Sequence, residues 1–207
     1  MVSQVHALLG CGSEESRQRL FADLFMQHRR QLRCMVESRL DVRLQARVDP
    51  SDVLQEAYLD ASRRLGEYLR SVPMPFYLWL RRIAGQKLVD LYRQHMGARG
   101  RDVRKQVPFG GDGLPEASSE MLAARFLADQ STPSKNVLRD EAKAALLSTL
   151  ASMDPQDREI LALRHFEEMS NADAARVLGI AGSAASKRHI RALKRLQACL
   201  SPSGRGG

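Results

Sequence analysis

The sequence predicts an all-α protein made of two small helical domains that are joined by a flexible linker. Helix-favouring residues, namely Ala, Leu, Arg, Glu and Gln, are abundant in the 207-residue chain. Apolar residues recur at helical spacing in several segments, and no segment alternates apolar and polar residues as a half-buried strand would. The helical period is lost over residues 97–133, where Gly and Pro are frequent. We therefore expect domains at residues 14–96 and 134–200, with the linker at 97–133.

Three helices are expected in the first domain. Ser13 is a suitable start for the first of them, which runs over residues 14–40. The second, at 51–69, follows an Asp-Pro pair that suits a first helical turn. The third spans residues 76–96, after a break rich in Pro. Within the linker only residues 119–128 have a short helical period, so the linker is expected to contribute no core.

The second domain is expected to end in a helix-turn-helix. Its last two helices are separated by a short break that begins at Gly179, a residue type that tolerates the left-handed backbone at a helix end. No Asp or Glu occurs from Ala174 to Gly207, so the last helix is strongly basic. The four helices expected in this domain span residues 134–151, 155–166, 170–178 and 183–199.

The last basic helix is suited to the major groove of DNA. In helix-turn-helix proteins the first residues of the second helix reach base edges, and cations hold the phosphates. The alternative is a basic, solvated helix of an ordinary bundle; the agreement of turn, caps, core spacing and charge favours DNA binding. The residues expected to contact DNA are Ser183, Ala184, Ser186, Lys187, Arg188 and Arg191.

Composition narrows the class of protein. The net charge of +8 and the pI of about 9.9 favour a polyanionic partner. The three cysteines form no C-x-x-C pair and the five histidines form no zinc-binding pattern, so neither a metal nor a cofactor is expected. No catalytic motif is found, and we do not expect an enzyme. The sequence has neither a signal peptide nor an apolar stretch of membrane-spanning length, which predicts a cytoplasmic protein without membrane insertion.

Two segments of the first domain have a surface chemistry of their own. Asp52, Gln55 and Glu56 lie on one helical face beside an apolar row; by itself, such a face is more often simply solvated. Residues 76–82 mix aromatic residues with arginines, a combination that can stack on unpaired bases and hold the nucleic-acid backbone. Anchoring of the core is an equal alternative for the Phe and the Trp of this segment.

Blocks in both domains match patterns of a known family. Residues 52–61 (D-V-L-Q-E-A-Y-L-D-A) are similar to D-L-V-Q-E-x-F-L-x-A, and residues 76–84 are similar to F-x-x-W-L-x-x-I-A. Residues 154–161 (D-P-Q-D-R-E-I-L) look like L-P-x-x-x-R-E-V-L, and residues 170–196 follow with the helix-turn-helix. In this order, the blocks resemble regions 2 and 4 of the sigma-70 family of bacterial RNA polymerase sigma factors, in its extracytoplasmic-function (ECF) type.

The resemblance implies a promoter-specificity subunit with region 2 at residues 14–96 and region 4 at 134–200. Such a protein directs promoter-specific transcription initiation by binding core RNA polymerase and recognising the −10 and −35 elements of promoter DNA. The resemblance implies that the chain contacts the β′ clamp helices and the β flap of the polymerase. The contact with the clamp helices would be made by Asp52, Gln55, Glu56 and Leu59. The resemblance also implies that the melted −10 element lies near Tyr77, Trp79, Arg81, Arg82 and Gln86. The helix that starts at Ser183 would read the −35 element as duplex.

Some residues depart from the family pattern, and other interpretations remain at this stage. Gln86 stands where the family commonly has Asn, and Ala184 replaces a Thr of the turn, so no −35 sequence is implied. Whether an anti-sigma factor is a further partner is left open. A stand-alone helix-turn-helix regulator that binds operators as a dimer would give the block at Asp52 no role. An interaction protein that sequesters a regulator would leave the basic C-terminal helix unexplained.

Overall fold

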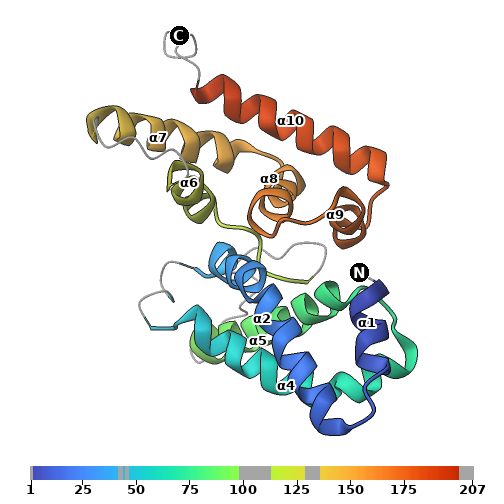
Figure 1. The fold of residues 1–207 in the computed structure, drawn as a ribbon. Coiled ribbons are helices and arrows are strands. Elements are labelled where there is room, and N and C mark those ends of the chain that lie inside the picture. Colours follow the sequence, from blue (N-terminus) through green and yellow to red (C-terminus); the bar gives the residue numbers. More distant parts are fainter. Residues whose placement is uncertain (1, 42–43, 45–46, 98–112, 129–135, 201–207) are drawn as a thin grey trace. The chain divides into compact units, whose positions relative to one another are not determined.

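The computed structural model describes residues 2–41, 44, 47–97, 113–128 and 136–200 (Figure 1). Within these ranges all the regular elements longer than a single residue are helices, which confirms the predicted all-α fold class. The chain separates into two compact units, which we call unit 1 (residues 1–106) and unit 2 (residues 107–207). None of the described helices is both long and apolar enough to span a membrane.

Unit 1 contains the three helices that the sequence predicts in its first domain. Ser13 caps the first of them, since its hydroxyl accepts the N–H of Ser16 at 3.1 Å. Asp49 caps the second by accepting the N–H of Ser51 at 2.7 Å, with Pro50 in the first turn. These helices pack against one another. The helices described in unit 1 are α1 (Val2–Leu9), α2 (Glu14–Arg39), α4 (Pro50–Ser71) and α5 (Phe76–Gly97).

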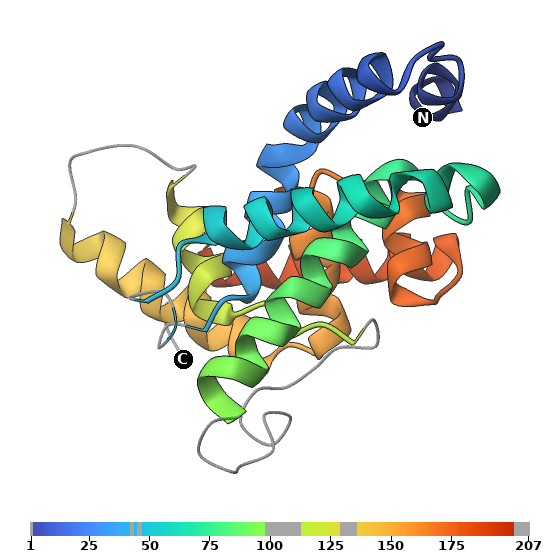
Figure 2. The ribbon, with the colours of Figure 1, turned by 90° about the horizontal axis from the view of Figure 1, so that it is seen from below.

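Helix α1 is not expected from the sequence analysis. It lies beside the N-terminal end of α2, as the turned view in Figure 2 shows, and packs on α2 and α4. Val5 and Leu8 are buried there, and their spacing of three residues places them on one helical face. Eight residues offer too short a window for a periodic pattern to stand out, which is why this helix was missed.

An aromatic cluster forms much of the core of unit 1. The ring of Trp79 stacks on that of Tyr68, with centroids 4.4 Å apart, and Phe76 lies 5.7 Å from Trp79. Phe21 of α2 stacks on Tyr58 of α4 at 5.4 Å. Rings from α2, α4 and α5 therefore hold the three helices together.

Unit 2 is built around the helices that the sequence predicts in its second domain, with one change of helix type. The N–H of Glu167 bonds to the carbonyl oxygen of Ala162 at 3.0 Å, five residues back, so the helix expected at 155–166 ends as a π-helical turn. The helices described in unit 2 are α6 (Ser119–Ala128), α7 (Asn136–Ser152), α8 (Pro155–Leu161), the π-helical turn η2 (Ala162–Phe166), α9 (Asn171–Leu178) and α10 (Gly182–Leu200).

Helix α6 corrects the expectation that the linker contributes no core. Leu122 and Ala123 are fully buried, and α6 packs on α7. Phe126 contacts Phe166 with ring centroids 4.9 Å apart. The helix forms where the sequence shows its short period, and the apolar face of that period is what unit 2 buries. Residues 98–112 and 129–133 of the predicted linker lie outside the described residues, as do the first two residues of the helix predicted at 134–151.

Candidate nucleic-acid interface

Helices α9 and α10 form the predicted helix-turn-helix. Ser170 caps α9 by accepting the N–H of Asp173 at 3.0 Å. Gly179 ends α9 with φ 64° and ψ 31°, the left-handed conformation in which an L side chain would be strained. The amide of Asn171 donates to the carbonyl oxygen of Gly182 at 2.9 Å, which ties the start of α9 to the start of α10. The turn is therefore fixed by hydrogen bonds on both sides.

The buried face of α10 differs from the expected one. Ala185, Ala192 and Leu196 are buried, and α10 packs with this face on α7, α8 and α9. Helical spacing in the sequence predicts a core face of Ile190, Leu193, Leu196 and Leu200 for this helix. Leu196 is buried as predicted, but the side chain of Ile190 is 53% exposed. The two alanines are seven residues apart and so lie on one face, where small side chains let neighbouring helices approach closely. A search for large apolar residues overlooks such a face.

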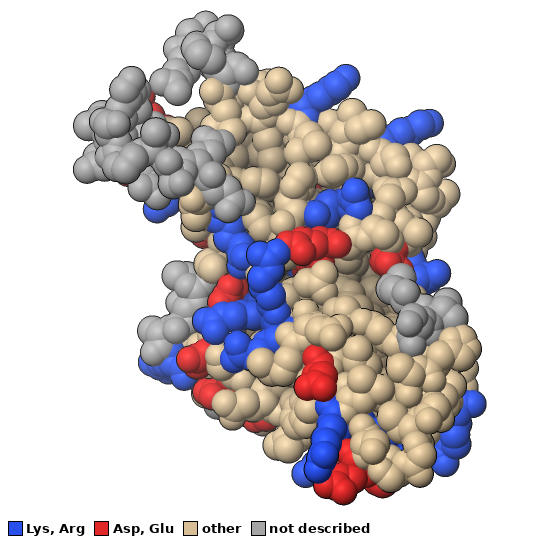
Figure 3. Space-filling model, viewed as in Figure 1, with Lys and Arg blue, Asp and Glu red and all other residues tan. Residues whose placement is uncertain are grey.

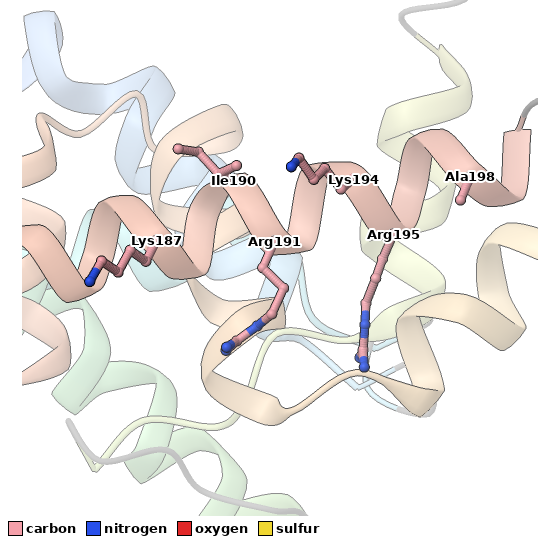
Figure 4. A pocket seen from close by; sticks show the side chains of 6 residues that line it. All are labelled: Lys187, Ile190, Arg191, Lys194, Arg195 and Ala198. Carbon is pink, nitrogen blue, oxygen red and sulfur yellow. The ribbon is translucent and has the colours of Figure 1, made fainter.

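The opposite face of α10 is a basic stripe that contains one large apolar side chain. A shallow groove of about 540 Å³ runs along it. In Figure 4, Ile190 and Lys194 lie on one side of this groove, and Arg191 and Arg195 point to the other. In Figure 3, basic side chains project from the upper outline of the molecule, where α10 lies in Figure 1. The residues that line the groove are Lys187, Ile190, Arg191, Lys194, Arg195 and Ala198.

Most of the predicted DNA contacts lie at the start of α10. Ser183 and Lys187 are exposed, and Ala184 and Ser186 are half-buried. The hydroxyl of Ser186 donates to the carbonyl oxygen of Gly182 at 3.1 Å, within its own helix. Its oxygen can still accept a hydrogen bond from a ligand. These four side chains are brought together on the first two turns, as a helix that enters a groove requires.

Arg188 and Arg191, the other two predicted DNA contacts, are held by an acidic side chain of α8. The carboxylate of Asp157 accepts two bonds from Arg191, at 2.8 Å from Nε and 2.6 Å from Nη2. It accepts a third, at 2.7 Å, from Nη1 of Arg188, which also lies 3.3 Å from Asp154. Burial acts to raise the pKa of Asp157, but the bonds and charges of Arg191 and Arg188 outweigh it and lower the pKa below its usual range.

A pair of histidines also ties α10 to the π-helical turn. Nε2 of His165 lies 2.9 Å from Nε2 of His189, a distance at which one ring donates to the other. Burial, together with the positive charge of Arg164, lowers the pKa of both rings. The lowered pKa values favour the neutral form of both rings, so His189 contributes less positive charge to the basic stripe than a free histidine would.

On unit 1, the face predicted to contact the polymerase is exposed on α4. Asp52, Gln55, Glu56 and Leu59 are all exposed, and Leu59 shows 54% of its surface. Beside them a groove of about 390 Å³ runs between α2 and α4, and Met26 at its edge is 62% exposed. The sequence analysis missed the contribution of α2, because no spacing rule relates these two distant segments. The groove is lined by Ala22, Phe25, Met26, Arg29, Ser51, Leu54, Gln55, Tyr58 and Leu59.

The five residues of α5 predicted to meet the −10 element divide into two groups. Arg82 and Gln86 are exposed. Trp79, Tyr77 and Arg81 are 8%, 7% and 4% exposed, so they offer little surface to bases in this conformation, and their place near the −10 element stays a prediction. The reason is packing, since the indole ring of Trp79 stacks inside the aromatic core. The core alternative for this segment therefore describes its tryptophan correctly.

The described residues offer no site for a metal. No group of three or more His, Cys, Asp or Glu side chains within them is arranged to hold a metal ion.

Comparisons with known proteins identify the family. Residues 143–196, which include α8, α9 and most of α10, match the family described as "Sigma-70, region 4". The RNA polymerase sigma-H factor of Pseudomonas aeruginosa is 31% identical over 154 residues, 74% of each chain. The sigma factor CnrH of Cupriavidus metallidurans is 34% identical over 152 residues, 73% of each chain. The ECF sigma-E factor of Haemophilus influenzae is 26% identical over 157 residues, 76% of this chain and 77% of that one.

The likeness extends over both units. Each alignment is longer than either unit, so it includes residues of both. The solved structure of CnrH in complex with the cytosolic domain of CnrY is similar over 96% of this chain and 95% of that one, with a TM-score of 0.51 and 26% identity. A stand-alone helix-turn-helix regulator would share only the C-terminal unit with these proteins. The chain therefore belongs to the sigma-70 family of RNA polymerase sigma factors, in its ECF subfamily.

Proposed function

We propose that this sigma factor divides promoter-specific initiation between its two units, with the polymerase contact on unit 1 and the −35 contact on unit 2. The observation that carries this proposal is the helix-turn-helix of unit 2, whose exposed basic stripe lies within the matched region 4. Sigma factors are initiation factors and not enzymes, and they act on core RNA polymerase and promoter DNA. We further propose that the chain acts in the bacterial cytoplasm, where both of these partners are found.

The contact with core polymerase is assigned to the groove between α2 and α4. Asp52, Gln55 and Glu56 supply polar and acidic groups along its edge. Met26 and Leu59 supply exposed apolar surface, which gains free energy when a partner helix covers it. A largely apolar groove that includes Arg29, with Asp52 and Glu56 exposed on one of its two helices, suits an amphipathic helical partner, and the β′ clamp helices are the expected one.

The DNA contacts are assigned to α5 and α10. Arg82 and Gln86 remain as the exposed residues of α5 for the melted −10 element. On α10, Ser183, Ala184, Ser186 and Lys187 are the base-reading group for the −35 element. Holding unpaired bases at one element while anchored at the other lets protein contacts offset the cost of opening the duplex.

A regulatory partner is also proposed. CnrH was solved with the cytosolic domain of CnrY bound, and that similarity supports a comparable anti-sigma protein as a partner of this chain.

The test combines binding and transcription. Purified full-length protein is mixed with core polymerase and a promoter library, and transcript starts are mapped. Replacing Leu59 with Asp should weaken core binding by about 10- to 100-fold, because it puts a charge where about 1.5–3 kcal/mol of apolar burial is expected. Glu67→Ala on the same helix is the matched control, since Glu67 is exposed away from the groove. Absence of core binding and of new start sites in the unmodified protein would refute the function.

Separate variants test the two contacts. Lys187→Ala should weaken binding to the promoter duplex and leave core affinity unchanged. If Leu59→Asp and Lys187→Ala reduce both affinities equally, the assignment of separate roles to the two units is wrong.

A further inference from the structure

The acidic side chain that holds α10 is unusually well enclosed. Asp157 is 1% exposed and lies in the first turn of α8, where an acidic residue also interacts favourably with the helix dipole. Three bonds from two arginines, between 2.6 and 2.8 Å long, satisfy its carboxylate. Bonds this short between charged groups are the stronger kind of hydrogen bond. The position of both guanidinium groups is therefore set by α8 and not by solvent.

The same contacts neutralise part of the basic stripe. Arg188 and Arg191 bring two positive charges, and Asp157 and Asp154 bring two negative ones to within 3.3 Å of them. A phosphate that approached either arginine would also approach the buried carboxylate, and this repulsion reduces the gain. Seen from a distance, this part of α10 is close to neutral.

Three other cations of α10 differ in this respect. Lys187, Lys194 and Arg195 are exposed, and they have no ion pair within the part of the chain that the structure describes. They can follow any phosphate backbone, because a mobile, solvated cation needs no particular geometry to attract DNA. The stripe thus holds exposed cations that have no ion pair within the described residues beside two arginines that are ion-paired.

We propose that Asp157 is a specificity-determining residue of DNA recognition, which withdraws Arg188 and Arg191 from general attraction to phosphates and holds them in one position. This inference rests on the proposed role of α10 as the reading helix. An arginine fixed by a carboxylate keeps spare N–H donors in a set direction, and such donors favour one groove geometry over others. A free arginine strengthens binding to every DNA sequence alike. Asp157 therefore lowers non-specific affinity and raises the ratio of specific to non-specific affinity.

The variant Asp157→Asn tests this by removing the charge while keeping the size of the side chain. The probe is a random-sequence DNA duplex, titrated with the full-length protein by fluorescence anisotropy over a series of salt concentrations. Each arginine released to a phosphate should steepen the slope of log affinity against log salt by about 0.9. Between 50 and 200 mM salt, this makes the loss of affinity about threefold larger for one arginine and about tenfold larger for both.

Two more variants keep the test decisive if Asp157→Asn does not fold. With Asp157 intact, Arg191→Gln should leave the salt slope unchanged, because the charge it removes is already neutralised. Lys187→Gln should reduce the slope by about 0.9, as expected for a mobile cation that contacts phosphate. Circular dichroism verifies that each variant is folded before binding is compared.

Several results would overturn the proposal. One is a salt slope for folded Asp157→Asn that is unchanged or shallower than that of the unmodified protein. Another is a reduction of the salt slope in Arg191→Gln that equals the reduction in Lys187→Gln. On a promoter duplex found by mapping transcript starts, a specific to non-specific affinity ratio that stays level or rises in Asp157→Asn would also overturn it. The duplex titration contains no polymerase, so failure of the proposed sigma function shows separately, as absent core binding.

Discussion

Replacing Tyr68, on which Trp79 stacks, tests whether this tryptophan belongs to the core of unit 1. Tyr68 is 3% exposed, and burying an aromatic side chain removes about 150–250 Å² from water. At about 25 cal/mol per Å² this amounts to roughly 4–6 kcal/mol as an upper bound. Measured losses for such substitutions are about 3–5 kcal/mol. We therefore expect Tyr68→Ala to lower the free energy of unfolding of unit 1 by about 4 kcal/mol.

A second substitution separates the ring from its hydroxyl. The hydroxyl of Tyr68 donates to the carbonyl oxygen of Met74 at 2.9 Å. Tyr68→Phe removes only this bond and should lower the free energy of unfolding by about 1 kcal/mol. The difference between the two variants measures what the stacked ring contributes.

The assay uses the only tryptophan of the chain. Because Trp79 lies in unit 1, its fluorescence during urea unfolding reports on that unit. Glu67→Ala, an exposed change on the same helix, is the control and should stay within about 0.5 kcal/mol of the unmodified protein. Acrylamide should quench Trp79 weakly, both before and after single-stranded DNA is added. Strong quenching of the native protein, or a loss under about 1 kcal/mol for Tyr68→Ala, would refute the core assignment.

Three further predictions concern pH and the turn. Burial raises the pKa of Tyr68 to about 12, so its contribution to the stability of unit 1 is complete below about pH 10 and should be lost between about pH 10 and 12. The variant Tyr68→Phe has no hydroxyl to ionise and should not show this loss. Identical alkaline unfolding of the two proteins would contradict the prediction. The pKa of Asp157 is lowered, so its contribution to the stability of unit 2 is present above about pH 4 and is lost as the pH falls further. Asp157→Asn should lower the free energy of unfolding by about 2 kcal/mol at neutral pH, a figure reduced to allow for the exposure of the two arginines. The variant should also lose less stability on acidification, as followed by circular dichroism. Gly179→Ala should cost about 1 kcal/mol in thermal unfolding because φ is 64° there, and a neutral effect would show that the turn relaxes.

The local signals of the sequence were sufficient to predict most of the helices and several of their caps, although α1 was missed. The Asp-Pro pair at the start of α4 and Ser170 before α9 predict where each helix begins, because capping hydrogen bonds involve only neighbouring residues. Gly179 likewise predicts the end of α9, because glycine tolerates the left-handed conformation of a helix C-terminus. The amphipathic period of residues 119–128 likewise indicated α6, although not that unit 2 would bury it.

The direction in which side chains face depends on contacts between distant segments, and here the sequence was insufficient. Trp79 and Arg82 are three residues apart and would share a helical face, yet one is buried and the other exposed. Tyr68 and Phe76 decide this, because they close over the indole ring. Ile190 shows the reverse case, since it is a large apolar residue that is exposed while the small Ala192 on the same helix is buried.

The effective charge of α10 also depends on contacts with a distant segment of the chain. The sequence from Ala174 onward contains no acidic residue, so a count along the chain gives α10 five positive side chains. The structure brings Asp157 back to this helix from 31 and 34 positions away and neutralises two of them. The three exposed cations that remain on α10 would together give a salt slope of about 2.7 at most, because each phosphate contact adds about 0.9. Under the proposed function the polymerase presents α10 to the promoter, and an acidic residue that restrains two arginines would limit the binding of α10 to other DNA.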